Sequence, residues 1–234
     1  ADSLEQSEQR RQEFIANVSH ELKTPMTTIG GYVDGILDGT IPKDNEKHYL
    51  QIVSSEVRRL SRLVRSMLDL SRLQAQGIDE SRKTRFDLGD VMSDVLITFE
   101  QKINARGLQV SVDLPEKPVW TKADRDAITQ VVYNLLDNAI KFCPVGGNLG
   151  LILEQDGQKA RLRIRNTGQT IPPEELPLLF DRFHKADKAR SADREGWGLG
   201  LYIAKTIIGA HGGEIWATSE NGVTEFSFTL PAVR

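Results

Sequence analysis

The residues of this sequence that could carry histidine or thiol chemistry are few. The histidines are His20, His48, His184 and His211, and Cys143 is the single cysteine. One cysteine excludes both an intrachain disulfide and a cysteine-based zinc cluster, and it favours a reducing compartment. No two histidines have the spacing of a helical metal-binding pair. If the protein uses histidine chemistry, we expect that chemistry to rest on one residue.

His20 lies on the polar side of a predicted helix, about 160° from the centre of its apolar stripe at ~100° per residue. Glu21 follows directly, Thr24 is one turn further on, and Pro25 removes a backbone hydrogen bond and should kink the helix. A solvated helix face is the simplest interpretation of these residues. The apolar stripe consists of Ile15, Val18, Leu22, Met26, Ile29, Val33 and Ile36.

Polar residues also line a helix predicted over residues 124–142. Asn134, Asn138 and Lys141 follow one another at spacings of four and three, to one side of the apolar face. Asparagine is a poor helix former, so two of them inside a helix need an explanation. Hydrogen bonding within a polar core is one explanation, and a ligand site is the other.

A glycine cluster, residues 196–201, precedes another helix predicted over residues 199–210. No predicted strand leads into it, which disfavours a dinucleotide-binding fold, but its backbone could approach a phosphate at a helix N-terminus. The segment between Gly168 and Gly198 is rich in charge and proline and has the length of a functional loop. Its Lys188 and Arg190 could meet a nucleotide or simply be solvated.

Two helices must position His20. A turn signal at residues 38–42 ends the first, and the second carries a heptad of apolar residues. One hairpin cannot cover both stripes, so we expect two chains to form a four-helix bundle, with packing on the rest of the same chain as the alternative. The heptad consists of Leu50, Val53, Val57, Leu60, Val64 and Met67.

After a polar connection over residues 76–85, helical and strand-like segments alternate, which predicts a layered α/β domain. The helices are predicted at residues 88–104, 124–142 and 199–210, with a short helical piece at 174–183. The strands are predicted at residues 110–114, 150–154, 160–165, 214–217 and 224–230.

The 234 residues carry a formal net charge of −3, which fits one or two globular domains. This balance argues against a nucleic-acid groove, which needs a basic excess. No apolar run is long enough to span a membrane. Residues 1–11 are polar, lack the features of a signal peptide, and are interpreted as the end of a helix that begins upstream.

Residues 14–25 resemble the H box of sensor histidine kinases, the dimerisation and phosphotransfer module of two-component systems. The resemblance is nearly continuous over this stretch. It implies that His20 accepts a phosphoryl group from ATP and that Glu21 accepts a proton from the imidazole. It also implies that Thr24, together with Glu21, serves in dephosphorylating the partner protein.

The later motifs follow in the order of the same family. Residues 134–142 resemble its N box, which implies Mg²⁺ bound by Asn138 and a phosphate side lined by Asn134 and Lys141. Residues 180–183 resemble its F box and residues 196–201 its G2 box. The nucleotide-contacting residues implied by these motifs are Asn134, Asn138, Lys141, Phe142, Phe183, Lys188, Arg190, Gly196, Gly198, Leu199 and Gly200.

The G1 box is degenerate. The family pattern is Asp-x-Gly-x-Gly, whereas this sequence has Asn166, Gly168 and Thr170 at the three positions. The family aspartate accepts a hydrogen bond from the adenine amino group. Asn166 could keep that bond through its amide oxygen but without charge assistance. Thr170 replaces a glycine that would allow positive φ at the hinge of the ATP lid.

The resemblance implies the cytoplasmic core of a membrane-anchored sensor histidine kinase. Residues 1–76 would form the dimeric helical bundle, residues 77–85 a linker, and residues 86–234 an ATP-binding α/β sandwich of the GHKL (Bergerat) type shared with gyrase and Hsp90. The implied cofactors are ATP and Mg²⁺, and the implied partners are a second copy and a response-regulator receiver domain. Two alternatives stay open: a phosphatase or scaffold with weak kinase activity, and an interaction module that holds no nucleotide.

Overall fold

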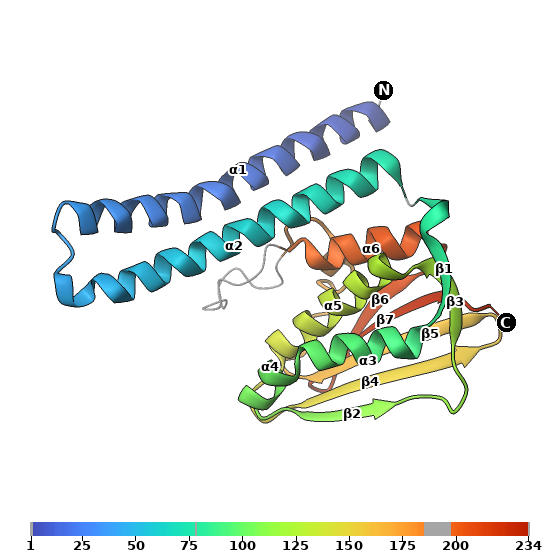
Figure 1. Ribbon diagram of the computed structural model, residues 1–234. Helices are drawn as coiled ribbons and strands as arrows, with labels where there is room; N and C mark the ends of the chain where they lie inside the picture. The colour runs from blue at the N-terminus through green and yellow to red at the C-terminus, as the bar shows by residue number, and fades with distance from the viewer. Residues whose placement is uncertain (1, 78, 185–197, 234) are drawn as a thin grey trace. The chain divides into compact units, whose positions relative to one another are not determined.

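The computed structural model describes residues 2–77, 79–184 and 198–233 (Figure 1). The chain divides into two compact units. One contains residues 2–69, and the other contains residues 70–77, 79–184 and 198–233. We describe each unit by itself. Within the described residues, no helix combines the length and apolar character needed to cross a lipid bilayer.

The first unit is an antiparallel helical hairpin, as the sequence predicts. Helix α1 (Asp2–Leu37) contains Pro25 without ending there, and helix α2 (Lys43–Gln76) begins with acidic residues in its first turn. Such residues favour a helix N-terminus because they complement its dipole. In the connecting turn, Ile41 N donates to Gly35 O at 2.8 Å. The rings of Tyr32 and Tyr49, 4.9 Å apart, join the two helices.

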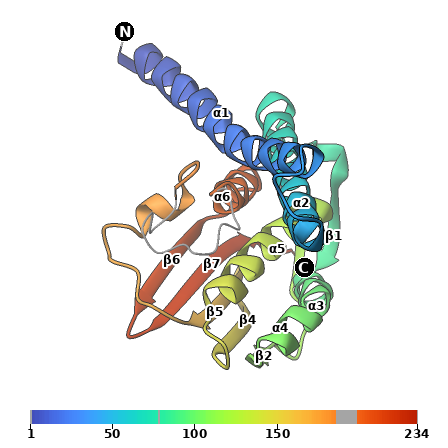
Figure 2. The ribbon, with the colours of Figure 1, turned by 90° about the vertical axis from the view of Figure 1, so that its left-hand side faces the viewer.

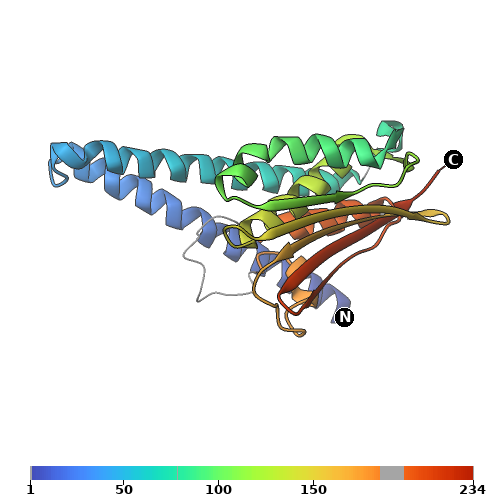
Figure 3. The same ribbon diagram turned by 90° about the horizontal axis from the view of Figure 1, so that it is seen from below.

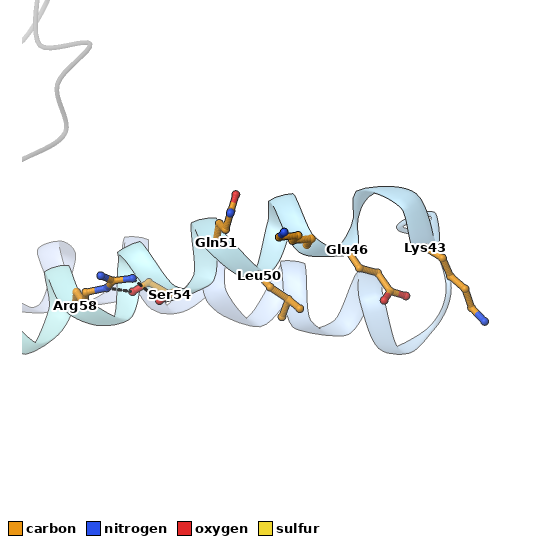
Figure 4. A pocket seen from close by; sticks show the side chains of 7 residues that line it. Lys43, Glu46, Leu50, Gln51, Ser54 and Arg58 are labelled. Carbon is orange, nitrogen blue, oxygen red and sulfur yellow. Dashed lines mark hydrogen bonds between the residues drawn. The ribbon is translucent and has the colours of Figure 1, made fainter.

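Apolar side chains of both predicted stripes remain exposed on this hairpin. Their exposed fractions range from 43% at Val64 to 60% at Met26. Leu50 belongs to this set, and it lines a shallow recess on α2 (Figure 4) together with polar residues that include Ser54 and Arg58. A single copy of the hairpin therefore leaves much of its apolar surface uncovered. The exposed members of the stripes are Ile15, Met26, Leu50, Val57 and Val64.

The second unit contains a mixed five-stranded sheet with the order β2-β4-β5-β7-β6. Strands β2 and β4 are parallel, and the other neighbours are antiparallel. Figure 3 shows helices on one face of this sheet, and Figure 2 shows α5 and α6 over its strands. The strands are β2 (Gln109–Asp113), β4 (Asn148–Asp156), β5 (Lys159–Thr167), β6 (Ile215–Glu220) and β7 (Val223–Pro231). The helices are α3 (Leu88–Thr98), α4 (Glu100–Ala105), α5 (Arg125–Phe142) and α6 (Gly200–Ala210).

The core of this unit lies between the sheet and the helices. Alternate residues of β4, β5 and β7 face the helices, so Leu151, Leu162 and Phe228 are fully buried. Leu135 and Leu136 of α5 are fully buried too. The strands of the sheet and the helices thus bury their apolar sides against each other, which is the α/β layering that the sequence predicts.

His211 joins the ends of α5 and α6. Its Nε2 accepts from the backbone N of Asp124, the residue that caps α5, at 3.0 Å. Its Nδ1 donates to the carbonyl of Ile207 on α6 at 2.8 Å. These two roles require a neutral imidazole. Burial lowers the pKa of His211 below its ordinary value, although the hydrogen bond to Ile207 acts in the opposite direction.

The structure corrects several predicted elements. Strands β1 (Lys83–Asp87) and β3 (Trp120–Asp124) pair antiparallel, although β1 begins inside the segment predicted as a polar connection. Phe86 is the only buried residue of β1, so its pattern carries little apolar signal. The predicted helix over residues 88–104 is broken at Phe99. The predicted helical piece at 174–183 contains only a short 3₁₀ turn, Pro177–Phe180, and another 3₁₀ turn, Glu80–Arg82, precedes β1.

Candidate functional site

The three candidate residues of the hairpin lie together on α1. His20 and Thr24 are exposed and Glu21 is half-buried. The Thr24 hydroxyl donates to the His20 carbonyl at 3.3 Å, one helical turn earlier. A shallow recess on this face is lined by His20, Thr24 and their neighbours Lys23, Thr27 and Thr28. An imidazole on an exposed helix face beside a carboxylate is open to a reactant from outside the hairpin.

Asn134 connects the predicted N box to the start of α6. Its Nδ2 donates to the carbonyl of Gly200 at 3.1 Å. A Cβ atom at Gly200 would lie 3.6 Å from Asn134 Cγ, which is ordinary van der Waals contact, so the two helices approach closely here. Leu199, the residue that precedes the first turn of α6, makes no side-chain capping hydrogen bond. Among the described residues, no side chain therefore caps the first N–H groups of α6, which is the property of helix N-termini that bind anions.

Asn138 and Lys141 follow Asn134 along the same side of α5, and all three are half-buried. Among the described residues, none forms a hydrogen bond with the Asn138 amide. Lys141 Nζ lies 5.3 Å from the centre of the Phe142 ring, and Phe142 itself is exposed. A half-buried amide with no partner among the described residues, one turn from a lysine, suits a hard cation and the charge of a phosphate.

Phe183 and Gly198 bring the F box to the G2 box. Phe183 N donates to the carbonyl of Gly198 at 3.0 Å, and both residues have positive φ. A Cβ at Gly198 would lie 2.6 Å from the carbonyl oxygen of His184, so a glycine is required. His184, which follows Phe183, pairs through Nε2 with Glu175 at 2.8 Å. Of the other candidates in this region, Lys188, Arg190 and Gly196 lie outside the described residues.

Asn166 carries a buried amide oxygen without a hydrogen bond. The residue is 3% exposed, its Nδ2 donates to the Thr167 carbonyl at 3.1 Å, and its Oδ1 has no partner among the described residues. Such an atom costs ~1–3 kcal/mol unless a ligand or a water supplies a donor. Two residues further on, a Cβ at Gly168 would lie 2.9 Å from the carbonyl oxygen of Phe142, which ties this loop to the end of α5.

Thr170 does not need the backbone freedom of the glycine it replaces. Among the described non-glycine residues, positive φ occurs at Phe183 and Asn221, so Thr170 has an ordinary backbone conformation. Its hydroxyl accepts a hydrogen bond from Gly222 N at 2.9 Å. No local sequence pattern predicts this contact. The Asn-Gly pair at 221–222 is a strong hairpin signal and could have located the turn, although not its partner.

Two protein-family models match the chain. The His Kinase A (phospho-acceptor) domain matches residues 10–76, and the histidine kinase-, DNA gyrase B- and HSP90-like ATPase matches residues 123–234. The solved catalytic domain of the histidine kinase ThkA is 31% identical, with a TM-score of 0.58, and the match covers 64% of this chain and 95% of that domain. The chain belongs to the sensor histidine kinases.

Relatives of this kinase extend the similarity to nearly the whole chain. Sensor protein SrrB of Staphylococcus aureus is 38% identical over 96% of the chain, which spans 38% of the length of SrrB. The structure of the Acinetobacter baumannii histidine kinase AdeS matches with a TM-score of 0.75 at 29% identity, over 92% of this chain and 98% of AdeS. ThkA in complex with the response regulator TrrA matches with a TM-score of 0.77 at 27% identity, over 99% of this chain and 66% of ThkA. Both the helical hairpin and the sheet unit thus have histidine-kinase counterparts.

Proposed function

We propose that this chain is the catalytic core of a sensor histidine kinase that transfers the γ-phosphoryl group of Mg-ATP to His20, and then to an aspartate of a response-regulator receiver domain. The contact between Asn134 and Gly200 carries the proposal. It joins α5, the helix that carries the two asparagines, to the N-terminus of α6, and helix N-termini of this kind bind phosphate. The exposed imidazole on α1 supplies the acceptor.

The sheet unit offers a distinct group for each part of a nucleotide. The start of α6 and Lys141 suit the phosphates, and Asn138 would hold Mg²⁺, which supplies charge neutralisation on those phosphates. The described residues contain no group of three or more His, Cys, Asp or Glu side chains that could hold a metal. Metal binding therefore depends on an amide oxygen and on the nucleotide itself.

At the base, Asn166 Oδ1 is the acceptor for the adenine amino group. The hydrogen bond from Nδ2 to the Thr167 carbonyl orients the amide, with Nδ2 toward that carbonyl and Oδ1 away from it. A base with a carbonyl oxygen at position 6 would place that oxygen against Asn166 Oδ1, and two acceptors form no hydrogen bond. Of the remaining candidates, Phe142, Gly168, Phe183, Gly198 and Leu199 would border the nucleotide, and Lys188, Arg190 and Gly196 are candidates outside the described residues.

In the transfer step, an imidazole nitrogen of His20 forms a bond to the γ-phosphorus while the bond to the bridging oxygen of ADP breaks. The other ring nitrogen carries a proton, which becomes acidic as the ring gains positive charge. Glu21 accepts this proton. Thr24, one turn away on the same face, would act with Glu21 when the response regulator is dephosphorylated.

Two copies of the hairpin would form the four-helix bundle. The exposed apolar residues Leu50, Val57 and Val64 are spaced by seven, so they form one seam along α2 that a second copy can cover. The complex of ThkA with the response regulator TrrA supports a receiver domain as the other partner. A position in the cytoplasm beneath a membrane-anchored sensory region is part of this proposal.

The alternative, a phosphatase or scaffold with little kinase activity, rested on Asn166 and Thr170. Asn166 Oδ1 is an acceptor with no partner among the residues that the structure describes, and the Thr170 backbone does not need a glycine. Neither departure therefore argues against nucleotide binding, and the relatives are histidine kinases. The kinase reaction is therefore the function we favour.

Incubation with γ-³²P-labelled ATP and Mg²⁺ tests the proposal. We expect acid-labile, alkali-stable label on the wild type and on His48→Gln, a matched control in which an exposed histidine of α2 is changed. His20→Gln should take up no label. Label on His20→Gln would contradict the assignment of the acceptor. Nucleotide binding without any label would support the phosphatase or scaffold.

A further inference from the structure

The turn between β6 and β7 is a tight hairpin turn of two residues. Asn221 and Gly222 have φ values of 51° and 76°, and they connect the paired residues Glu220 and Val223. Two consecutive left-handed residues make a two-residue hairpin turn whose geometry matches strand twist, and Asn-Gly is the pair that adopts it most readily. This turn is therefore a fixed support.

The loop after β5 is attached to this hairpin at three points. Gly168 N donates to Gly222 O at 2.9 Å, and Gly222 N donates to Thr170 Oγ1 at 2.9 Å. Ile171 N donates to Ser219 Oγ, also at 2.9 Å. The first bond is entirely between backbone atoms, and the third uses a side chain of the hairpin. Only the second depends on a side chain of the loop itself.

We propose that Thr170 is a positioning residue for the nucleotide, because its hydroxyl fixes the loop that carries Asn166 and Gly168 to the β6–β7 turn. A glycine at this position, as in the family pattern, would keep two of the attachments and lose this one. The inference rests on the proposed function, since it assumes that the loop borders a nucleotide. Thr170 would act indirectly, because its hydroxyl binds Gly222 and not the nucleotide.

The freedom of the loop before binding determines what the attachment at Thr170 contributes. A loop that is already held in its bound conformation loses less entropy when the ligand arrives. The loop has little room to move, because Gly168 packs against the Phe142 carbonyl and Asn166 is buried. Loosening the attachment at Thr170 therefore weakens nucleotide binding. The transfer step itself is affected less, because the hydroxyl is used by Gly222 and not by the reacting phosphate.

The test compares Thr170→Val, which keeps the shape without the hydroxyl, with Thr170→Ser, which keeps the hydroxyl. Thr229→Val is the matched control, because Thr229 Oγ1 also accepts from a backbone N–H, that of Glu214, at the opposite end of β7. Calorimetry gives the affinity for Mg-ADP. Hydrogen exchange at the Gly222 amide reports the bond directly, and autophosphorylation rates separate KM for ATP from kcat.

We expect Thr170→Val to weaken Mg-ADP binding about three- to tenfold, the range for one net hydrogen bond, and to speed exchange at Gly222. Its KM should rise more than its kcat falls. Thr170→Ser should restore binding, and Thr229→Val should leave it unchanged. Unaltered affinity of Thr170→Val despite faster exchange at Gly222 would overturn the inference, as would a Thr170→Ser variant as weak as Thr170→Val. Absence of Mg-ADP binding by the wild type would instead refute the proposed function on which the inference rests.

Discussion

The two units of this chain meet the need to bury apolar surface in opposite ways. The sheet unit buries Leu151, Leu162 and Phe228 completely within one chain. The hairpin leaves Leu50 and Val57 about half exposed. The core of the sheet unit is thus complete in a single copy, whereas that of the hairpin requires a second surface. Stability should therefore be intramolecular in one unit and dependent on protein concentration in the other.

The largest effect is expected in the core of the sheet unit. Phe228→Ala should lower the free energy of unfolding by about 3–5 kcal/mol, because it leaves a cavity where the ring is fully buried. Denaturant unfolding followed at the sheet unit measures this loss. Val223→Ala, on the same strand but 39% exposed, is the control and should change little. A loss that disappears at high protein concentration would contradict the self-contained core.

A charge in the seam of the hairpin should abolish the dimer. Val57→Glu places a carboxylate where the second copy would pack, and symmetry repeats it in both chains, at a cost of several kcal/mol in total. Sedimentation should give a monomer at micromolar concentration with the sheet unit still folded. Val110→Glu, an exposed valine of β2, should remain dimeric. A dimeric Val57→Glu would indicate that another surface joins the copies.

The pH dependence of the sheet unit should reflect His211. Burial lowers its pKa in the folded state, so below an unfolded-state pKa of ~6.5 the unfolded chain binds more protons than the folded one. The contribution of His211 is therefore complete above that pH and is lost as the pH falls toward the lowered folded-state value. Between pH 7.5 and 5.5 the wild type should lose more stability than His211→Gln. Equal losses in the two proteins would reject this role.

The smallest effect is expected at an exposed ion pair between α4 and α5. Lys102 Nζ lies 2.7 Å from Asp137 Oδ1, and both side chains are substantially exposed. Lys102→Met should change the stability of the sheet unit by at most ~1 kcal/mol, and less in high salt. Thermal unfolding at two salt concentrations measures this. A larger change would show that the stem of Lys102 contributes packing as well as charge.

Much of the fold was predictable because its patterns are local. The three- and four-residue steps of α1 and α2 and the alternation in β4, β5 and β7 all lie within single elements. Strand β1 was not predicted, because a strand with one buried residue looks like a polar linker. Strand β3 was not predicted either, because its buried residues Thr121, Ala123 and Asp124 form no apolar alternation. The break at Phe99 also depends on packing that no local pattern carries.

The candidate site was predictable as a set of residues but not as a set of contacts. The spacing of Asn134, Asn138 and Lys141 placed them on one side of α5. That Asn166 keeps a free acceptor depends on the carbonyl of Thr167, which has no sequence signal of its own. The role of Thr170 depends on Gly222, 52 residues away, and thus on the register of the sheet.

The imidazole of His211 has a mechanical consequence for α5 and α6. These two helices are linked at one end through His211 and again at the contact of Asn134 with Gly200. Because the two contacts lie at separate points along the helices, they oppose sliding of one helix along the other. A displacement of the α6 N-terminus at Gly200 therefore acts on α5 as well.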